Sequence, residues 1–379
     1  MANSLVRGKK SCDISLGFGT PVLRFLWDVQ YVLLCTALQP ISWPSSGDIA
    51  ELSLWWDIAS ICKCNISGDT TFKFPSPVGG APFPIDYAPS IVFSVLYGLL
   101  VPVIVYRQAF KHSRNIVFIG TIAFVIVRIV LFALRSEQAH DPIKRVSSSM
   151  TKFMQSTITL AYGSMGVDLT SLLLCVVVNA TEGNPRIRWY PSVNSLDQEQ
   201  LEADPGVTEE ALSRAKERSR YRWICGTLRL IVWVPSILSI ISGVSYPKGE
   251  TDAKTAQLVQ TTRYAGSIFT CVMITTVTFL SIWWSMTVRN IVKAPCYIIA
   301  CLCTLLNVIT VYQLYIMHFH TTSLTSTSPG SLNSRGSKIC FYIFQATPEW
   351  LTSAILLSMN ARQWFGTGFS GDRMTDKKK

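Results

Sequence analysis

Seven apolar stretches lie between Ser90 and Met359, and each is long enough to cross a lipid bilayer. A membrane helix needs about 20 residues to cross a hydrocarbon core ~30 Å thick, and these stretches have about 17–26. Because backbone polar groups cannot stay unpaired in lipid, the stretches are expected to be helices. The sequence therefore predicts an all-α, polytopic bundle of seven membrane-spanning helices. These are Ser90–Tyr106, Asn115–Leu134, Phe153–Val178, Trp223–Tyr246, Tyr264–Met286, Ala294–Met317 and Ile339–Met359.

The composition agrees with a membrane bundle, because 49% of the residues are hydrophobic and only 15% are charged. The formal net charge is +11, but the Lys and Arg residues stand beside the apolar stretches. Such residues are typical of chains that face the anionic headgroups of the cytoplasmic leaflet. We therefore expect membrane lipids, and no nucleic acid, as partners. The chain is expected in the plasma membrane or the endoplasmic reticulum.

The distribution of Lys and Arg predicts the orientation. Segments that would share one side of the membrane carry 17 of these residues, and the loops on the other side carry 9. By the positive-inside rule, the N-terminus lies outside and the C-terminus lies in the cytoplasm. Three parts are expected: a non-cytoplasmic region over 1–88, a seven-helix domain over 89–360 and a basic cytoplasmic tail over 361–379.

The N-terminal region carries two further features. Phe25–Trp43 is apolar but contains polar residues, which is compatible with an eighth span, an interfacial helix or a signal sequence. An interfacial helix is the preferred interpretation. Asn65 opens an Asn-x-Ser sequon on the predicted outer side, so we expect glycosylation at Asn65.

The cysteines do not form a framework of disulfides. Cys340 could pair with Cys62 or Cys64 on the outer side, and unpaired thiols are the other interpretation. The spacing of Cys and His residues does not match that of a metal site. No metal or cofactor is therefore predicted.

Two loops stand out in length or composition. The cytoplasmic loop 180–222 is expected to be irregular at first and then helical from Thr208, with Arg and Lys towards the membrane. It serves either as an anchor at the headgroups or as a docking surface for a cytoplasmic partner. Ser323–Ser337 is rich in Ser, Thr, Gly and Pro, and is expected to be flexible.

Four ionisable residues fall inside the predicted spans, where each costs roughly 2.5–3.5 kcal/mol on insertion scales. They are Arg128, Asp168, Arg229 and Glu349. Their depths suggest two ion pairs, Arg128 with Glu349 on the outer side and Asp168 with Arg229 on the inner side. Such pairs either fix neighbouring helices or form a site for a substrate, ligand or proton, and both interpretations stay open.

Glu349 is the sharper candidate for a site. Pro348 before it disturbs the hydrogen bonding of the helix, and Gln345 lies one turn away on the same face. Asn307 and Gln313 are expected to make hydrogen bonds between helices. The many aromatic side chains of these spans would suit a flat, apolar ligand. The ligand-binding residues expected from the sequence are Glu349, Gln345, Arg128, Asp168, Arg229 and Trp350.

The order of the spans and the end of the last one carry a resemblance. The segment FYIFQATPEW, which contains Glu349, is followed by Arg362. In these features the chain, from about Pro89 to Gly368, resembles two groups of fungal seven-transmembrane proteins. They are the lipid-translocating exporters and the proteins similar to G-protein-coupled receptors. The resemblance implies recognition or movement of a lipophilic small molecule. The chain departs from rhodopsin-type receptors, because Val177-Val178-Asn179 stands in place of their acidic-Arg-aromatic triplet.

Three functions remain compatible with the sequence. The first is a receptor-like or exporter-like protein that binds a hydrophobic small molecule in its bundle. The second is a membrane-embedded enzyme or accessory protein, as in fungal indole-diterpene biosynthesis. In a terpene-cyclase-like enzyme of this kind, Glu349 would be the catalytic acid and Asp168 a second one. The third is a structural membrane protein without a small-molecule site.

Overall fold

The computed structural model describes residues 72–110, 114–181, 205–288, 290–328, 330–369 and 371. The predicted interfacial helix Phe25–Trp43, the sequon at Asn65, and Cys62 and Cys64 lie outside the described residues. Those predictions therefore stay open, together with a disulfide to Cys340, which lies exposed on its helix.

Helices make up most of the described chain, as predicted. In the first half they are α3 (Tyr87–Gly98), α4 (Leu100–Ala109), α5 (Ile119–His140), α6 (Pro142–Arg145) and α7 (Ser148–Ala180). In the second half they are α8 (Pro205–Ile231), α9 (Trp233–Ser245), α10 (Ala253–Thr287), α11 (Lys293–Ile316), α12 (Arg335–Phe341), the π-helical turn η5 (Tyr342–Ala346), α13 (Thr347–Ser358) and α14 (Ala361–Trp364). The short 3₁₀ turns are η1 (Pro84–Asp86) and η4 (Tyr246–Glu250).

Among the described residues, six helical segments are long and apolar enough to cross a membrane. They are Pro84–Ala109, Ile119–His140, Ser148–Ala180, Arg214–Glu250, Ala253–Thr287 and Lys293–Ile316. The region of the seventh predicted span is helical too, but it consists of α12, η5 and α13 in direct succession. The multi-pass architecture thus follows from six segments, and the seventh crossing remains a prediction.

Proline explains the interruptions in two of the six segments and in the region of the seventh predicted span. A proline inside a helix cannot donate a hydrogen bond to the carbonyl four residues earlier. Pro102 follows the break between α3 and α4 at Leu99, and Pro235 follows the break between α8 and α9 at Val232. Pro348 is the second residue of α13, which directly follows the π-helical turn η5, and this confirms the predicted disturbance beside Glu349.

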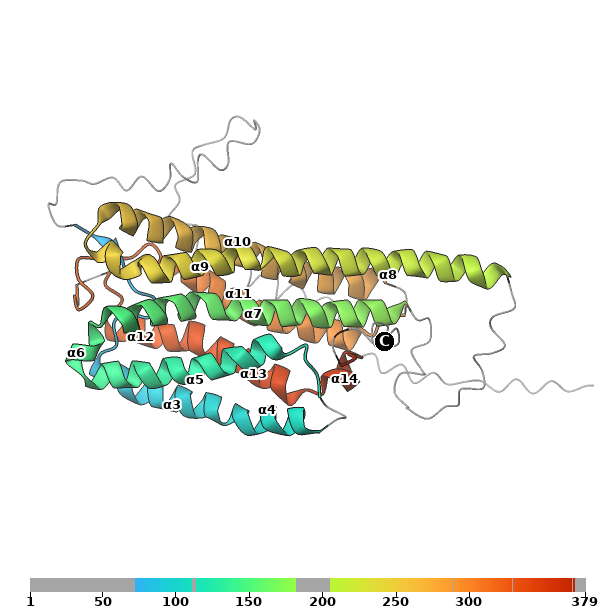
Figure 1. The fold of residues 1–379 in the computed structure, drawn as a ribbon, viewed down its shortest axis with the longest axis horizontal. Coiled ribbons are helices and arrows are strands. Elements are labelled where there is room, and N and C mark those ends of the chain that lie inside the picture. The colour runs from blue at the N-terminus through green and yellow to red at the C-terminus, as the bar shows by residue number, and fades with distance from the viewer. Residues whose placement is uncertain are drawn as a thin grey trace, which may run out of the picture.

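The central helix of the bundle is α7. Of the six segments, it has the most deeply buried apolar window, 82% of which lies inside the protein. It packs against α5, α8, α9, α10 and α11, while α3 packs on α5 and α13 packs on α11. Figure 1 shows the long helices side by side along the long axis of the molecule. We call the end with α6 the cap end and the end with α14 the tail end.

A close approach of α7 and α9 depends on Gly243. A Cβ atom at this position would lie 2.1 Å from the Ser156 hydroxyl and 2.4 Å from the Ser156 Cα. Substitution of Gly243 by a larger residue would therefore force the two helices apart. A Cβ atom added to Gly226 on α8 would have no neighbour within 4 Å, so Gly226 offers a matched comparison.

We predict that Gly243→Ala lowers the free energy of unfolding by about 1–3 kcal/mol, because an overpacked contact forces the helices apart. Gly226→Ala should be neutral or slightly stabilising, since alanine favours helix. Thermal unfolding of both purified variants in detergent tests this. Equal midpoints for the two variants would contradict the close approach.

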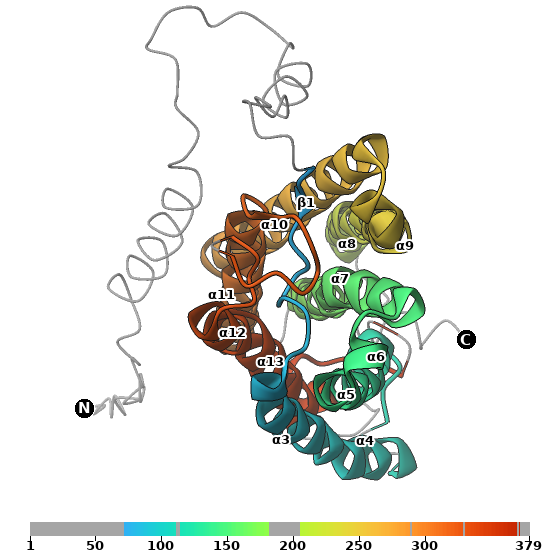
Figure 2. The ribbon, with the colours of Figure 1, turned by 90° about the vertical axis from the view of Figure 1, so that its left-hand side faces the viewer.

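Residues 72–86, here named the cap segment, cross the cap end of the bundle. Figure 2 looks onto this end and shows the segment running from β1 to α3 across the helices. Its strand β1 (Phe74–Pro75) pairs antiparallel with β2 (His320–Thr321), with Phe74 opposite Thr321. The Tyr246 hydroxyl donates to the Pro75 carbonyl over 2.8 Å. The cap segment is thus fixed to the second half of the chain.

The expectation of a flexible loop at Ser323–Ser337 is wrong. Leu324 and Leu332 are buried, and the Asn333 side chain accepts a hydrogen bond from the Ala81 amide over 2.8 Å. The Asn333 amide group donates to the carbonyls of Leu324 and Ser326. Polar composition misled the prediction, because here the polar side chains bind the loop's own backbone and the cap segment.

The helix expected in the loop 180–222 forms, but it begins at Pro205 and not after Thr208. It continues without interruption to Ile231, so one helix joins the predicted loop to the fourth span. Proline is well suited to the first turn of a helix, because an N–H group there would have no acceptor within the helix and its loss costs nothing. That preference competes with the predicted cap at Thr208.

Candidate functional site

A buried ion pair joins α5 to α13 in the core of the bundle. Arg128 Nη2 lies 2.7 Å from Glu349 Oε1, and both side chains are almost completely inaccessible. The guanidinium also donates to the carbonyls of Thr157 and Ile158 on α7, over 3.3 and 3.4 Å. It stacks over the Phe124 ring at 4.8 Å. The predicted pairing of Arg128 with Glu349 is therefore confirmed.

Several polar atoms around this ion pair have no hydrogen-bond partner among the described residues. They are Tyr97 Oη, Arg128 Nε, Gln345 Oε1 and Thr352 Oγ1. The Tyr97 hydroxyl also interacts electrostatically with both charges of the pair. Buried polar atoms need partners, so their number marks this place as suited to internal water or to a polar group of a ligand.

The helix around Glu349 has an unusual geometry. η5 precedes Pro348, and the Thr347 hydroxyl donates to the Tyr342 carbonyl over 2.9 Å. Gln345 Nε2 reaches Glu349 Oε1 at 3.5 Å, as expected for residues on one face. π-Helical turns inside helices are frequent at functional sites. The local backbone therefore singles out the same position as the ion pair.

Trp350 does not join this group. Its indole Nε1 donates to the Leu96 carbonyl over 3.2 Å, so the ring is directed at α3. The structure thus brings together Arg128, Gln345 and Glu349 from the sequence-based set. Of the two predicted interhelical amides, Gln313 accepts from the Tyr162 hydroxyl at 2.9 Å, while the Asn307 side chain has no partner among the described residues.

The predicted pairing of Asp168 with Arg229 is wrong as a direct ion pair, although the charge of Arg229 acts on the Asp168 carboxylate electrostatically. Asp168 Oδ2 accepts hydrogen bonds from the Thr121 amide and the Thr121 hydroxyl, each over 2.7 Å. Thr121 stands in the first turn of α5, where backbone N–H groups lack partners within the helix. Arg229 lies exposed on α8, and no ion pair joins it to Asp168 in the described part of the chain. The carboxylate therefore caps a neighbouring helix.

This correction predicts different results for the two residues. Asp168→Ala should lower the free energy of unfolding by about 1–2 kcal/mol, the usual loss when a helix cap is removed. Arg229→Ala should change it by less than about 0.5 kcal/mol, as for other exposed positions. Unfolding of the purified variants in detergent measures both. Equal losses would restore the ion pair that the sequence suggested.

A second buried cluster lies at the cap end, and the sequence analysis missed it. The Asp86 carboxylate accepts from Arg135 Nη2 at 3.2 Å, from Lys338 Nζ at 2.5 Å and from the Tyr342 hydroxyl at 3.1 Å. Arg135 also donates to the Gly79 carbonyl over 2.6 Å, and Lys338 donates to that of Ala81. The cluster thus fixes the cap segment to α5 and α12.

A spacing in the sequence could have indicated this cluster. Thr121, Arg128 and Arg135 recur every seven residues, which places them on one face of α5. That face meets Asp168, Glu349 and Asp86 at successive depths. Because Arg135 stands at the end of the apolar stretch, the sequence alone suggests a place for it among the nine Lys and Arg residues of the outer loops.

The cap segment has a further fastening at Arg263 of α10. The buried guanidinium donates to the Ser76 carbonyl at 3.0 Å and to Gln155 Oε1 at 2.6 Å. Gln155 Oε1 also accepts from the Val78 amide at 3.0 Å, and the Tyr246 ring lies 4.7 Å from the guanidinium carbon. In the part of the chain that the structure describes, this buried cation binds neutral acceptors and no carboxylate, and these bonds stabilise the cap segment.

Comparisons with protein-family models, with characterised proteins and with solved structures found no match to this chain. Within the described residues, no group of three or more His, Cys, Asp or Glu side chains could hold a metal ion. The candidate site is therefore defined by its own geometry. It consists of the Arg128–Glu349 ion pair with Tyr97, Gln345 and Thr352.

Proposed function

We propose that this chain is a seven-span membrane protein that recognises or moves a lipophilic small molecule within its helix bundle, as a receptor or an exporter does. The α12–η5–α13 segment would be the seventh span, with the N-terminus outside and the C-terminus in the cytoplasm. The single observation that carries the proposal is the buried Arg128–Glu349 ion pair, surrounded by polar atoms that have no hydrogen-bond partner among the described residues. Ionisable groups in spanning helices commonly mark substrate paths and ligand sites.

The surroundings of the pair suit a ligand that is mainly apolar and carries one polar group. The Phe124 ring packs against the Arg128 guanidinium, and Tyr97 packs against Phe124 and Phe132. A hydroxyl or carbonyl group of the ligand would satisfy the polar atoms of Tyr97 or Gln345 in place of water. Membrane lipids surround the protein, which would sit in the plasma membrane or the endoplasmic reticulum.

The geometry favours recognition over acid catalysis. A catalytic acid has to present a proton to the substrate. Glu349 accepts a charge-assisted hydrogen bond from Arg128, and Asp168 accepts two hydrogen bonds from Thr121. These hydrogen bonds stabilise the ionised form of each carboxyl group, whereas the alternative, a terpene-cyclase-like enzyme, needs one of them protonated.

The proposal can be tested with the purified protein and a lipophilic extract of the cells that express it. Wild type, Glu349→Gln and Glu137→Gln are each immobilised, incubated with the extract and washed. The compounds retained are then identified by mass spectrometry. Glu137 forms an exposed ion pair with Lys144 and provides the matched control. A compound held by wild type and Glu137→Gln, but at least tenfold less by Glu349→Gln, would support recognition at this site.

The same variants are then expressed in cells, and lipophilic compounds are compared between cells and medium. An unchanged set of compounds that moves between the two fractions only with an intact Glu349 supports export. A new compound that depends on Glu349 would replace the proposal with the enzyme. No retained compound and no difference in either fraction would overturn recognition and movement alike.

A further inference from the structure

One face of α8 points away from the bundle and becomes basic at the tail end. Figure 1 shows α8 beside the other long helices and continuing past the tail end. The Tyr221 ring packs edge-on against Trp284 of α10, with 5.4 Å between the ring centroids, and Cys225 is buried. Residues four apart lie on one face of a helix, so Tyr221 and Cys225 identify the face that meets the bundle.

The opposite face changes from apolar to basic towards the N-terminus of α8. Leu230 and Trp223 are 70% and 72% exposed, and Arg220 and Lys216 are exposed as well. Steps of seven, three and four residues join these positions, which is the spacing of a single helical face. We call Lys216, Arg220 and Trp223 the basic stripe.

The level of the basic stripe is that of the lipid headgroups. Trp side chains gather at the boundary between hydrocarbon and headgroups, and Trp223 and Trp283 are both exposed near the tail end. At ~1.5 Å per residue, Arg220 lies ~4.5 Å and Lys216 ~10 Å beyond Trp223. The headgroup layer is about 5–7 Å deep on each side. Arg220 therefore reaches the phosphates directly, and the long side chain of Lys216 can extend back to them.

The two cations are not neutralised within the described part of the chain. No hydrogen bond or ion pair there holds Lys216 or Arg220. Glu217 is the only acidic residue in the sequence from Arg214 to Ile231. It follows Lys216 directly and so points about 100° away around the helix. The charge of the basic stripe therefore favours an anionic partner.

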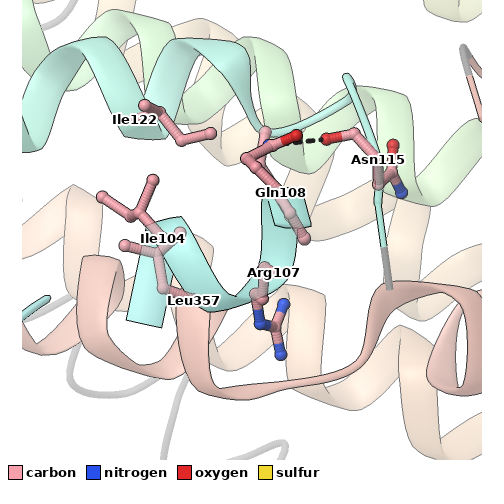
Figure 3. A pocket seen from close by; sticks show the side chains of 7 residues that line it. Ile104, Arg107, Gln108, Asn115, Ile122 and Leu357 are labelled. Atoms are coloured by element: carbon pink, nitrogen blue, oxygen red, sulfur yellow. Dashed lines mark hydrogen bonds between the residues drawn. The ribbon is translucent and has the colours of Figure 1, made fainter. Parts of the chain in front are cut away.

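Other helix ends add positive charge at the tail end. Arg107 lies in the last turn of α4 beside Gln108, whose side chain donates to the Asn115 carbonyl at 3.4 Å (Figure 3). Lys293 is the first residue of α11 and is exposed. Such charges attract anionic headgroups over a Debye length of about 10 Å. The surroundings of the basic stripe thus favour the same kind of partner.

We propose that the basic stripe binds anionic phospholipids of the leaflet at the tail end, with the headgroup at Arg220 and Lys216 and an acyl chain along Trp223 and Leu230. An acidic protein is the competing partner, because α8 continues past the bundle. A lipid is favoured because basic and apolar residues follow each other along one face, as headgroup and acyl chain do in a phospholipid. This inference needs the chain to cross a membrane, but it does not depend on recognition at Glu349.

The test measures which lipids lie next to Trp223. The full-length chain is reconstituted in phosphatidylcholine vesicles with a small fraction of dibrominated phosphatidylglycerol or dibrominated phosphatidylcholine, whose bromine atoms quench nearby Trp fluorescence. Subtraction of the signal of Trp223→Phe isolates the quenching at Trp223. One Lys or Arg near an anionic surface changes the affinity about fivefold. We therefore expect phosphatidylglycerol to be enriched at least fivefold at Trp223, and less in high salt.

Two variants locate the effect. Lys216→Gln/Arg220→Gln should reduce the enrichment to less than about twofold, since both headgroup contacts are lost. Lys254→Gln removes an exposed cation at the cap end and should keep the enrichment. The proposal fails if the two lipids quench Trp223 equally in the wild type, or if Lys216→Gln/Arg220→Gln leaves the enrichment unchanged. In the first case, binding of a decaglutamate peptide that depends on Lys216 and Arg220 would assign the basic stripe to an acidic protein instead.

Discussion

Glu349→Leu is expected to lower the free energy of unfolding by about 3–5 kcal/mol, because it leaves the buried Arg128 charged and without its counter-ion. The two remaining hydrogen bonds of Arg128, to the carbonyls of Thr157 and Ile158, are 3.3 and 3.4 Å long and do not replace a carboxylate. Arg128→Met should cost a similar amount, since it strands Glu349. Unfolding in detergent with increasing dodecyl sulfate measures both variants.

The double variant Arg128→Met/Glu349→Leu distinguishes the loss of the ion pair from the effect of leaving one charge unpaired. Removal of both charges leaves no unpaired ion, so much of the lost stability should return. Replacement of Lys144 and Glu137 in the same way gives the control, because their ion pair is exposed and contributes little to stability. Additive losses at Arg128 and Glu349 would show that the two side chains do not stabilise each other.

Hydropathy and charge predicted much of the fold because the membrane limits the choices. An apolar stretch of about 20 residues can only be a helix there, so length alone placed the main helices. The depth of two opposite charges inside predicted spans was also enough to pair Arg128 with Glu349. In both cases the cost of exposing polar groups to lipid restricts the possible structures.

Contacts that depend on short polar groups could not be predicted. Asp168 and Arg229 also stand at similar depths, but the carboxylate instead binds the unpaired backbone amide at the beginning of α5. Depth identifies a level in the membrane and not a direction around the helix. An N–H group of a helix end carries no signal in the sequence that would reveal it as the competing partner.

The contacts of the cap segment could not be predicted for the same reason, and they join residues that lie far apart in the sequence. Ala81 binds Asn333, and Ser76 binds Gly330, across more than 250 residues of chain. These bonds use backbone atoms and small polar side chains, which have no periodic pattern. Polar loops that fold onto each other therefore look like solvated loops in the sequence, as Ser323–Ser337 did.

Asp86→Ala is expected to be the second strongly destabilising substitution, with a loss of about 3–5 kcal/mol. The single carboxylate faces two buried cations, Arg135 and Lys338, and it also accepts from the Phe83 amide at 3.0 Å. Without it, both cations remain buried with only carbonyl and hydroxyl acceptors. The repulsion between them should then drive the cap segment away from α5 and α12.

Release of the cap segment distinguishes this local loss of stability from destabilisation of the whole bundle. In Asp86→Ala, amide hydrogens of the cap segment should exchange with solvent at least tenfold faster, while those at the centre of α7 change little. Asp141→Ala provides the control, because Asp141 caps the exposed helix α6 and should cost only about 1 kcal/mol.

Removal of one cation tests whether repulsion between Arg135 and Lys338 causes the loss of stability in Asp86→Ala. In Asp86→Ala/Lys338→Met, a single buried charge remains, so part of the stability and of the protection should return. If instead the double variant is no more stable than Asp86→Ala, the loss comes from the hydrogen bonds of Asp86 and not from its charge. The hydrogen bonds that Asp86 accepts from the Tyr342 hydroxyl and the Phe83 amide would then hold the cap segment. The two buried cations would be tolerated without a counter-ion.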